Sequence, residues 1–331
     1  MKQPIFRNCR NGGKWLLALA ATFILSGSAL SQDDVIRVET NLISIPVTVT
    51  DRDGRRQVGL TEKNFTVREN DVPQKIEYFG TTDTPLTVLF LLDASGSMGR
   101  YMDSVAKAAT AFILKLKPQD HVVVASFGEE IKIILPDTQR NALRGKLVLD
   151  PAAGKDTHVY DAVDFGLREI QKARGHKAIV LFTDGESERD RVTADDNLRG
   201  ALESGAAIYT VRFGEMNKFY IDNGNFGLDT QAAAERQKYY EHQLGRSKSI
   251  GKYMTGLAVK TGGRAFNIEA IGNLDKTFGE IVDELALQYT LGYYSNQPGS
   301  PGERRPIRVT VNVPKTTIRT RAEVVFKGSQ K

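Results

Sequence analysis

The stretch from Thr87 to Ser97, which reads Thr-Val-Leu-Phe-Leu-Leu-Asp-Ala-Ser-Gly-Ser, decides the fold. Its first six residues form an almost continuous apolar run, too uniformly hydrophobic for a strand with one face in water. Such a run is typical of a central strand in a parallel sheet, because helices cover both faces of that sheet. The run passes directly into the polar group 93–97, so we expect that group to lie where the strand ends.

The chain on either side of this stretch alternates between strand patterns and helical spacing. We expect further strands at 122–127, 131–135, 178–183 and 207–213, and helices at 102–116, 161–174 and 197–204. Strands that alternate with helices of this length indicate βαβ units. The predicted fold class is therefore α/β, with a doubly wound, mostly parallel sheet over residues 85–290. A polar insertion at 214–250 interrupts the pattern, and the helical spacing resumes near Leu257.

Polar groups follow two of the predicted strands, and a third polar group lies in a loop. The carboxyl ends of parallel strands meet at one rim of a sheet, so the groups at 93–97 and 183–185 would share that rim. The loop at 154–158 leads into a helix and can reach it. The candidate site residues are Asp93, Ser95, Ser97, Thr157 and Asp184. Two carboxylates and three hydroxyls form an all-oxygen set, which suits a hard cation: Mg²⁺ above all, or Mn²⁺ or Ca²⁺.

Each of these motifs alone also has a simpler structural interpretation. An Asp-x-Ser-x-Ser string before a helix is commonly a turn in which Ser97 caps the helix, and Thr-Asp-Gly is a common turn. The metal prediction depends on their combination. Two carboxylates roughly neutralise a divalent ion, and the helix expected after Ser97 would add to the local field. An open coordination position there would attract an Asp or Glu of a partner protein.

Two β-rich segments flank the α/β domain, at 34–82 and 291–328. Apolar residues alternate with polar ones from Ile43 to Val49, which predicts a half-buried strand, and Pro46 indicates that this strand lies at a sheet edge. Asp51-Arg-Asp-Gly54 predicts a plain turn and lacks the later ligands of a calcium loop. In the C-terminal segment, 307–313 and 318–326 each predict one strand. The two segments could pair into one module beside the α/β domain.

The first 31 residues have the layout of a secretory signal peptide. Positive charge at 1–14 precedes an apolar run at 15–25 and small residues at 26–31. Eleven apolar residues are too few for a membrane span, so we expect cleavage after Ser31, a secreted or periplasmic protein and no transmembrane span in the mature chain. The chain has a formal net charge of +5, but four basic residues and no acid lie in this segment. The remainder is nearly balanced, which gives no support to nucleic-acid binding. Cys9, the only cysteine, also lies in the segment, which excludes internal disulfides and thiolate-bound metals.

The quoted motifs resemble the von Willebrand factor type A domain and its metal-ion-dependent adhesion site, over about residues 85–290. The resemblance implies a Rossmann-like, doubly wound sheet with one antiparallel edge strand. It also implies that Ser95, Ser97 and Thr157 bind the metal directly or nearly so, and that Asp93 and Asp184 bind directly or through water. The wider layout is similar to bacterial secreted "VWFA-related" proteins. The segment 60–76, the motif Thr261-Gly-Gly-Arg-Ala-Phe266 and the motif Tyr289-Thr-Leu-Gly-Tyr293 carry that similarity. The insertion at 214–250 departs from a minimal domain of this family.

Two other functions compete with metal-dependent protein binding. A hydrolase would need a base for Ser95 or Ser97, but neither serine lies in a Gly-x-Ser-x-Gly elbow, so we expect no enzyme. His158 is expected to face solvent or to support the site indirectly. Binding to anionic cell-envelope material is the other alternative, and a solvated strand face would explain its basic residues equally well. Those basic residues of the C-terminal segment are Arg304, Arg305, Arg308, Lys315, Arg319 and Arg321.

Overall fold

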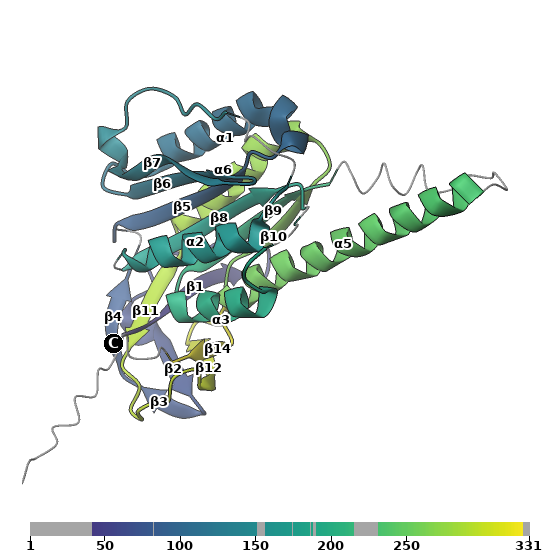
Figure 1. Ribbon diagram of the computed structural model, residues 1–331. Helices are drawn as coiled ribbons and strands as arrows, with labels where there is room; N and C mark the ends of the chain where they lie inside the picture. Colours follow the sequence, from purple (N-terminus) through teal and green to yellow (C-terminus); the bar gives the residue numbers. More distant parts are fainter. Residues whose placement is uncertain are drawn as a thin grey trace, which may run out of the picture. The chain divides into compact units, whose positions relative to one another are not determined.

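The computed structural model describes residues 42–81, 83–150, 156–173, 175–185, 187, 190–214 and 231–326 (Figure 1). The predicted signal peptide lies outside these residues. Within them, no helix combines the length and the apolar character that crossing a membrane would require.

A six-stranded sheet forms the centre of the described chain, in the order β10-β9-β8-β5-β6-β7. All neighbouring pairs are parallel except β6 and β7, which are antiparallel. The predicted doubly wound, mostly parallel α/β sheet with one antiparallel edge strand is thus confirmed. Its strands are β5 (Leu86–Asp93), β6 (His121–Phe127), β7 (Ile131–Gln139), β8 (His176–Thr183), β9 (Ala207–Phe213) and β10 (Ala265–Ile268).

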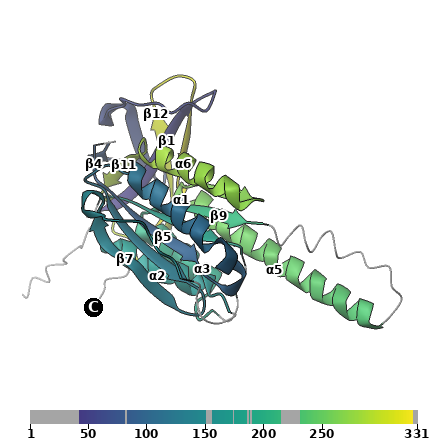
Figure 2. The ribbon, with the colours of Figure 1, turned by 90° about the horizontal axis from the view of Figure 1, so that it is seen from above.

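Helices cover both faces of this sheet, which explains the uniformly apolar strands. On one face, α1 (Met102–Lys115) and α6 (Leu274–Leu285) lie side by side (Figure 2). Their aromatic side chains meet the sheet at Phe90, whose ring centroid is 4.7 Å from that of Phe112 and 5.7 Å from that of Phe278. The other face carries α2 (Val159–Gln171), α3 (Ala194–Ser204) and α5 (Gln231–Thr261). Short 3₁₀ helices lie at Glu62–Asn64, Gly96–Tyr101, Arg140–Ala142 and Ile271–Asn273.

Strands from the two flanking segments share two four-stranded sheets. One sheet has the order β13-β1-β11-β4 and the other β14-β12-β2-β3, so each contains strands from both ends of the described chain. Buried Val, Ile, Leu, Phe and Tyr side chains of both segments form their common core. The N-terminal strands are β1 (Ile43–Asp51), β2 (Phe65–Glu69), β3 (Val72–Gln74) and β4 (Ile76–Gly80). The C-terminal strands are β11 (Tyr289–Tyr293), β12 (Arg304–Val311), β13 (Thr316–Thr320) and β14 (Glu323–Val325).

The prediction that Pro46 marks an edge strand is wrong, because β1 lies between β13 and β11. The proline is tolerated because β13 pairs with β1 only from Val47 onward. The carbonyl of Pro46 accepts a hydrogen bond from the Thr320 hydroxyl, which places that side of the residue toward β13. A residue without an N–H therefore costs this ladder no hydrogen bond.

Two other element predictions need correction. The single strand expected at 318–326 is two strands in different sheets, since β13 pairs with β1 and β14 pairs with β12. The chain turns between them at Arg321, whose guanidinium is buried and donates to the carbonyls of Glu323 and Ser44. The helix expected to resume near Leu257 begins earlier, because the last twenty residues of the insertion at 214–250 already belong to α5.

Candidate metal centre

Asp93 lies at the buried end of β5, as the strand pattern predicts. Its side chain is fully buried, because β5 has parallel neighbours on both sides and helices on both faces. One carboxylate oxygen, Oδ1, accepts a hydrogen bond of 2.9 Å from the backbone N–H of Ser95. This bond turns the chain sharply after the strand and directs Ser95 and Ser97 to the same rim.

The end of β8 meets this turn through side-chain hydrogen bonds. Thr183 donates from its hydroxyl to Asp93 Oδ2 at 2.6 Å, and Ser97 donates to Asp184 Oδ2 at 2.5 Å. The hydroxyls of Ser95 and Ser97 are 3.1 Å apart. Since the single proton of Ser97 goes to Asp184, Ser95 donates to Ser97. Four of the five predicted site residues thus join in one group, although Asp184 lies 87 positions after Ser97 in the chain.

Thr157 lies in a loop that is attached to the same rim of the sheet by a backbone hydrogen bond. The next residue, His158, donates its backbone N–H to the carbonyl of Gly128 at 3.2 Å, just after β6. The neighbouring carbonyl of Phe127 accepts from the N–H of Ala94 at 2.8 Å. The side chain of Thr157 is buried. Within the described part of the chain, it takes no part in the hydrogen bonds that join the other four residues.

A second set of contacts attaches the Thr157 loop to the segment after Asp184. The Ser187 hydroxyl accepts from the N–H of Val159, and Asp190 Oδ1 accepts from the N–H groups of Tyr160 and Asp161. These are the first N–H groups of α2, which have no partner within the helix itself. Sequence reasoning missed Thr183, Ser187 and Asp190. The only signal was the position of Thr183 beside Asp184.

Ser97 does not cap a helix, in contrast to the simpler interpretation of its motif. The residues after Ser95 form the 3₁₀ helix Gly96–Tyr101, and α1 begins only at Met102. The N-terminus of α1 is therefore where the sequence predicts it, and Ser97 lies before it in the 3₁₀ helix. This leaves the Ser97 hydroxyl free to bond Asp184, a contact between two strand ends.

The two carboxylates influence each other strongly. Burial, and secondly the charge of Asp184, raise the pKa of Asp93 to about 7, while hydrogen bonds from Ser95 and Thr183 act in the opposite direction. Such a pair is costly without a positive charge nearby. A divalent cation would supply that charge, and the donors around it would all be oxygens. By this criterion the residues fit a hard cation. No three His, Cys, Asp or Glu side chains group as metal ligands anywhere in the described chain, so this site has only two carboxylates and depends on its hydroxyls.

The side-chain polar contact of His158 in the described residues is with Asp161 rather than with either serine. Its Nδ1 lies 3.7 Å from Asp161 Oδ2 on the first turn of α2, and its side chain is mostly buried. Within the described part of the chain, the contacts of this side chain do not include a hydrogen bond to Ser95 or Ser97. His158 instead belongs to the polar contacts that surround the N-terminus of α2.

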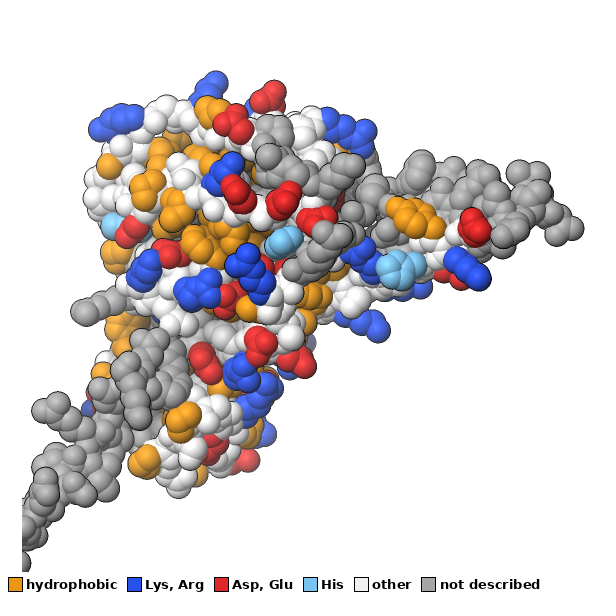
Figure 3. All heavy atoms as spheres, in the orientation of Figure 1, with side chains coloured by type: hydrophobic (Ala, Val, Ile, Leu, Met, Phe, Trp, Pro, Cys, Tyr) orange, Lys and Arg blue, Asp and Glu red, His pale blue; other side chains and the backbone are white. Residues whose placement is uncertain are grey.

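The basic residues of the C-terminal segment do not form one surface. Arg305 and Arg321 are only 5% and 3% exposed, and Arg305 donates to the buried carboxylate of Glu69. Arg319 pairs with Glu284. Three of the six predicted cations are thus internal or partly internal. On the face shown in Figure 3, Lys and Arg side chains are interspersed with Asp and Glu.

Comparison with known proteins gives the class of this domain. Residues 87–223 match the family description of the von Willebrand factor type A domain. The chain is 27% identical over 191 residues to inter-alpha-trypsin inhibitor heavy chain H3 of Bos taurus. The matched stretch covers 49% of this chain and 21% of that protein. It is 33% identical over 109 residues to an uncharacterized protein of Synechocystis sp., which covers 31% of this chain and 26% of that protein. The chain thus spans about a quarter or less of these relatives.

Among solved structures, a von Willebrand factor type A protein from Catenulispora acidiphila is similar, with a TM-score of 0.45 and 14% identity over 80% of this chain and 74% of that chain. The family match over residues 87–223 bears out the resemblance that the sequence motifs predict. Domains of this class act mostly in protein interactions.

Proposed function

We propose that the chain is an exported binding protein that captures an acidic residue of a partner protein through a divalent cation. Asp93, Ser95, Ser97, Thr157 and Asp184 would hold the cation, with Mg²⁺ preferred over Mn²⁺ or Ca²⁺. The hydrogen-bonded group that joins Asp93, Ser95, Ser97 and Asp184 carries this proposal. A bound cation would offer an open coordination position to an outside carboxylate.

The chain's own residues prepare this site in three ways. Buried Asp93 and Asp184 provide negative charge at a fixed place, and the serine hydroxyls keep oxygen atoms directed at it. The Thr183 hydroxyl fixes the orientation of the Asp93 carboxylate. Ser97 is exposed while Ser95 and both carboxylates are buried, so the site is accessible from one side. That accessibility suits capture of a residue that belongs to another molecule.

The flanking β segments and the N-terminal pattern complete the proposal. We infer that segments 34–82 and 291–328 act as one module beside the domain at 85–290. The positively charged and apolar pattern at 1–31 supports export, with a function in the periplasm or outside the cell. Arg305, Arg319 and Arg321 are internal or partly internal, so they cannot belong to one exposed basic surface. This removes most of the support for envelope binding through the C-terminal segment.

Calorimetric titration with Mg²⁺ and Mn²⁺ tests the metal site directly. We expect one cation per chain and at least about tenfold weaker binding in Asp184→Asn. Ser104→Ala, at an exposed serine of α1, serves as the control and should bind as the unaltered chain does. Absence of uptake by the unaltered chain would contradict the metal site.

Recovery of the partner tests the binding function. The full chain, immobilised and mixed with the envelope fraction of its source cell, should retain a protein in Mg²⁺ and release it in EDTA. The same protein should be missing when Asp184→Asn is immobilised. Equal recovery in Mg²⁺ and in EDTA would contradict capture through the cation.

A further inference from the structure

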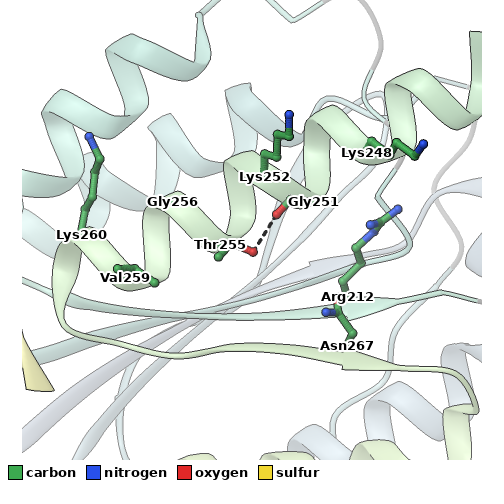
Figure 4. Close-up of a pocket in the computed structure, with 9 residues that line it drawn as sticks. All are labelled: Arg212, Lys248, Gly251, Lys252, Thr255, Gly256, Val259, Lys260 and Asn267. Carbon is green, nitrogen blue, oxygen red and sulfur yellow. Dashed lines mark hydrogen bonds between the residues drawn. The ribbon is translucent and has the colours of Figure 1, made fainter.

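A basic groove lies between α5 and the outer strands β9 and β10 (Figure 4). Its volume is about 670 Å³. Four of its nine lining residues are cationic, and none is acidic. The cations are Arg212, Lys248, Lys252 and Lys260. Apart from Val259, the other lining residues are glycines or carry a hydroxyl or an amide: Gly251, Thr255, Gly256 and Asn267.

The lysines lie in a row because of the helical repeat. Lys248 and Lys252 lie one turn apart on one side of α5, and Lys260 lies two turns further along, rotated by about a third of a turn from Lys248. The opposite side of α5 packs on the sheet through buried residues such as Met254 and Leu257. Lys260 lies 3.9 Å from Glu323, whereas Lys248 and Lys252 form no ion pair with any described residue. These two exposed cations are therefore available to a ligand.

Arg212 connects this groove to the metal centre. It projects from β9 toward α5, where it donates to the Ser247 hydroxyl. A Cβ atom at Gly251 would lie 2.7 Å from Arg212 Nη1, and one at Gly185 would lie 2.9 Å from its Nε. The guanidinium thus lies close both to Gly251 in the groove and to Gly185, the residue next to Asp184. Within the described chain, its buried Nε has no hydrogen-bond partner.

We propose that the groove binds an acidic, extended segment of the same partner whose carboxylate the metal centre captures. The inference rests on the proposed function. It adds that the part of the partner next to the captured residue is acidic and extended. The row from Lys248 to Lys260 spans about 18 Å at the rise of an α-helix. An extended chain of about five or six residues covers that length. A single phosphate group would reach only one or two of these cations.

The groove also offers hydrogen-bonding groups suited to a peptide. Asn267 of β10 pairs in backbone register with Arg212 of β9, and its exposed side chain presents both a donor and an acceptor. Thr255 already donates its hydroxyl to the carbonyl of Gly251 and can accept from a ligand N–H. A flat membrane surface would make little use of groups inside a groove.

The test uses the full chain and two fluorescent peptides. One is a hexapeptide of alternating Asp and Glu, and the other has a single Asp among Gly and Ser. Anisotropy titrations in Mg²⁺ should show tighter binding of the acidic hexapeptide. The double variant Lys248→Glu/Lys252→Glu should weaken its binding by about tenfold or more, because each reversal replaces an attraction by a repulsion. The single-Asp peptide should bind both proteins alike.

A matched control separates the groove from overall charge. Lys107→Glu/Lys276→Glu changes the net charge equally, but these exposed lysines lie on α1 and α6, on the opposite face of the sheet. It should bind the hexapeptide as the unaltered chain does. An equal loss of affinity in this control, or no loss in the groove variant, would overturn the proposal.

Two further arms distinguish the remaining outcomes. A hexapeptide that binds in EDTA but depends on Lys248 and Lys252 would support the groove and contradict capture through the metal. Binding that requires Mg²⁺ but ignores both lysines would contradict the groove alone. Phosphatidylglycerol vesicles and inorganic phosphate are the other probes. If either binds in a lysine-dependent way while the hexapeptide does not bind, the peptide proposal is wrong.

Discussion

Thr157 is the predicted ligand that no hydrogen bond joins to the rest of the site in the described residues. Its position depends on backbone contacts of its loop, so its hydroxyl can be removed with little effect on the fold. We expect Thr157→Val, which keeps the shape of the side chain, to bind Mn²⁺ at least about tenfold more weakly. Thr157→Ser keeps the hydroxyl and should retain most of the affinity. Calorimetric titration of both variants checks this, and unchanged affinity in Thr157→Val would remove the residue from the site.

His176 should make folding stability sensitive to acid. Burial lowers the pKa of this ring, although a hydrogen bond to Gln288 partly opposes that effect. The folded protein therefore keeps the ring neutral, whereas the unfolded chain takes up a proton below about pH 6.5. The stability that the neutral His176 ring contributes to the folded protein is fully present above that pH. It is lost as the pH falls toward the lowered pKa of His176 in the folded state.

The measurement must separate the effect of His176 on folding stability from that of Asp93, because the two effects have opposite signs as the pH falls. The pKa of Asp93 is raised to about 7, so protonation as the pH falls from 7 toward 4 favours the folded state. Urea unfolding of the unaltered chain and of His176→Gln, each at a series of pH values, gives the difference. We expect the advantage of the unaltered chain to shrink between pH 7 and pH 5. Parallel profiles would contradict the prediction, and His242→Gln, at an exposed site, serves as the control.

Much of the site could be predicted at the scale of single residues, because the ends of buried strands are visible in the sequence. Asp93 and Asp184 follow apolar runs, and neighbouring parallel strands bring their ends together. The hydroxyl of Thr183 and the carboxylate of Asp190 could not be found in this way. Their partners lie far away in the chain, and no local pattern encodes which N–H or carboxylate they contact.

At the scale of elements, the start of α2 is stabilised by a separate segment. Asp190 accepts from two of its first N–H groups, and Asp161 Oδ1 accepts in return from the N–H groups of Arg191 and Val192. We expect Asp190→Ala to lower the free energy of unfolding by about 1 kcal/mol, as the loss of a helix cap does. It should also weaken cation binding, because the Thr157 loop leads into this turn.

Urea denaturation with and without Mg²⁺ tests both effects of Asp190→Ala. The extra stability that Mg²⁺ gives should be smaller in the variant than in the unaltered chain. Asp275→Ala removes an exposed acid from the first turn of α6 and is the matched control. If Mg²⁺ stabilises Asp190→Ala as much as it stabilises the unaltered chain, the segment that contains Asp190 stabilises only α2 and does not support the metal site.

An element could be predicted where its burial leaves a recognisable pattern of apolar residues in the sequence. Strands covered on both faces are recognisable because nearly every residue is apolar. The two strands β13 and β14 were merged because alternation continues through Arg321, whose burial depends on carbonyls of distant residues. The start of α5 was missed because its first half is polar, without the regular apolar positions on which such predictions depend.

At the scale of the whole described chain, a buried polar network joins the α/β domain to the flanking strands. Glu284 of α6 accepts from the Tyr209 hydroxyl and pairs with Arg319 of β13. Gln288 bonds Tyr209, His176 and Thr48 of β1. The carboxylate of Glu284 is almost fully buried, so its charge depends on these partners.

Removal of Arg319 should therefore destabilise both parts together. We expect Arg319→Met to lower the free energy of unfolding by about 3 kcal/mol, since it leaves a buried carboxylate with less compensation. The double variant Glu284→Gln/Arg319→Met should recover part of that loss. Calorimetric unfolding checks this, and purely additive effects of the two substitutions would contradict a coupled pair.

The position of β1 between β11 and β13 has a consequence for how the protein is made. Ile43 pairs with Tyr293 and Val47 pairs with Thr320, so the first described strand cannot form these pairs until at least 250 further residues have been synthesised. Until then its backbone N–H and C=O groups are exposed, which invites pairing with other chains. We therefore expect the yield of native protein to depend on what shields this nascent strand.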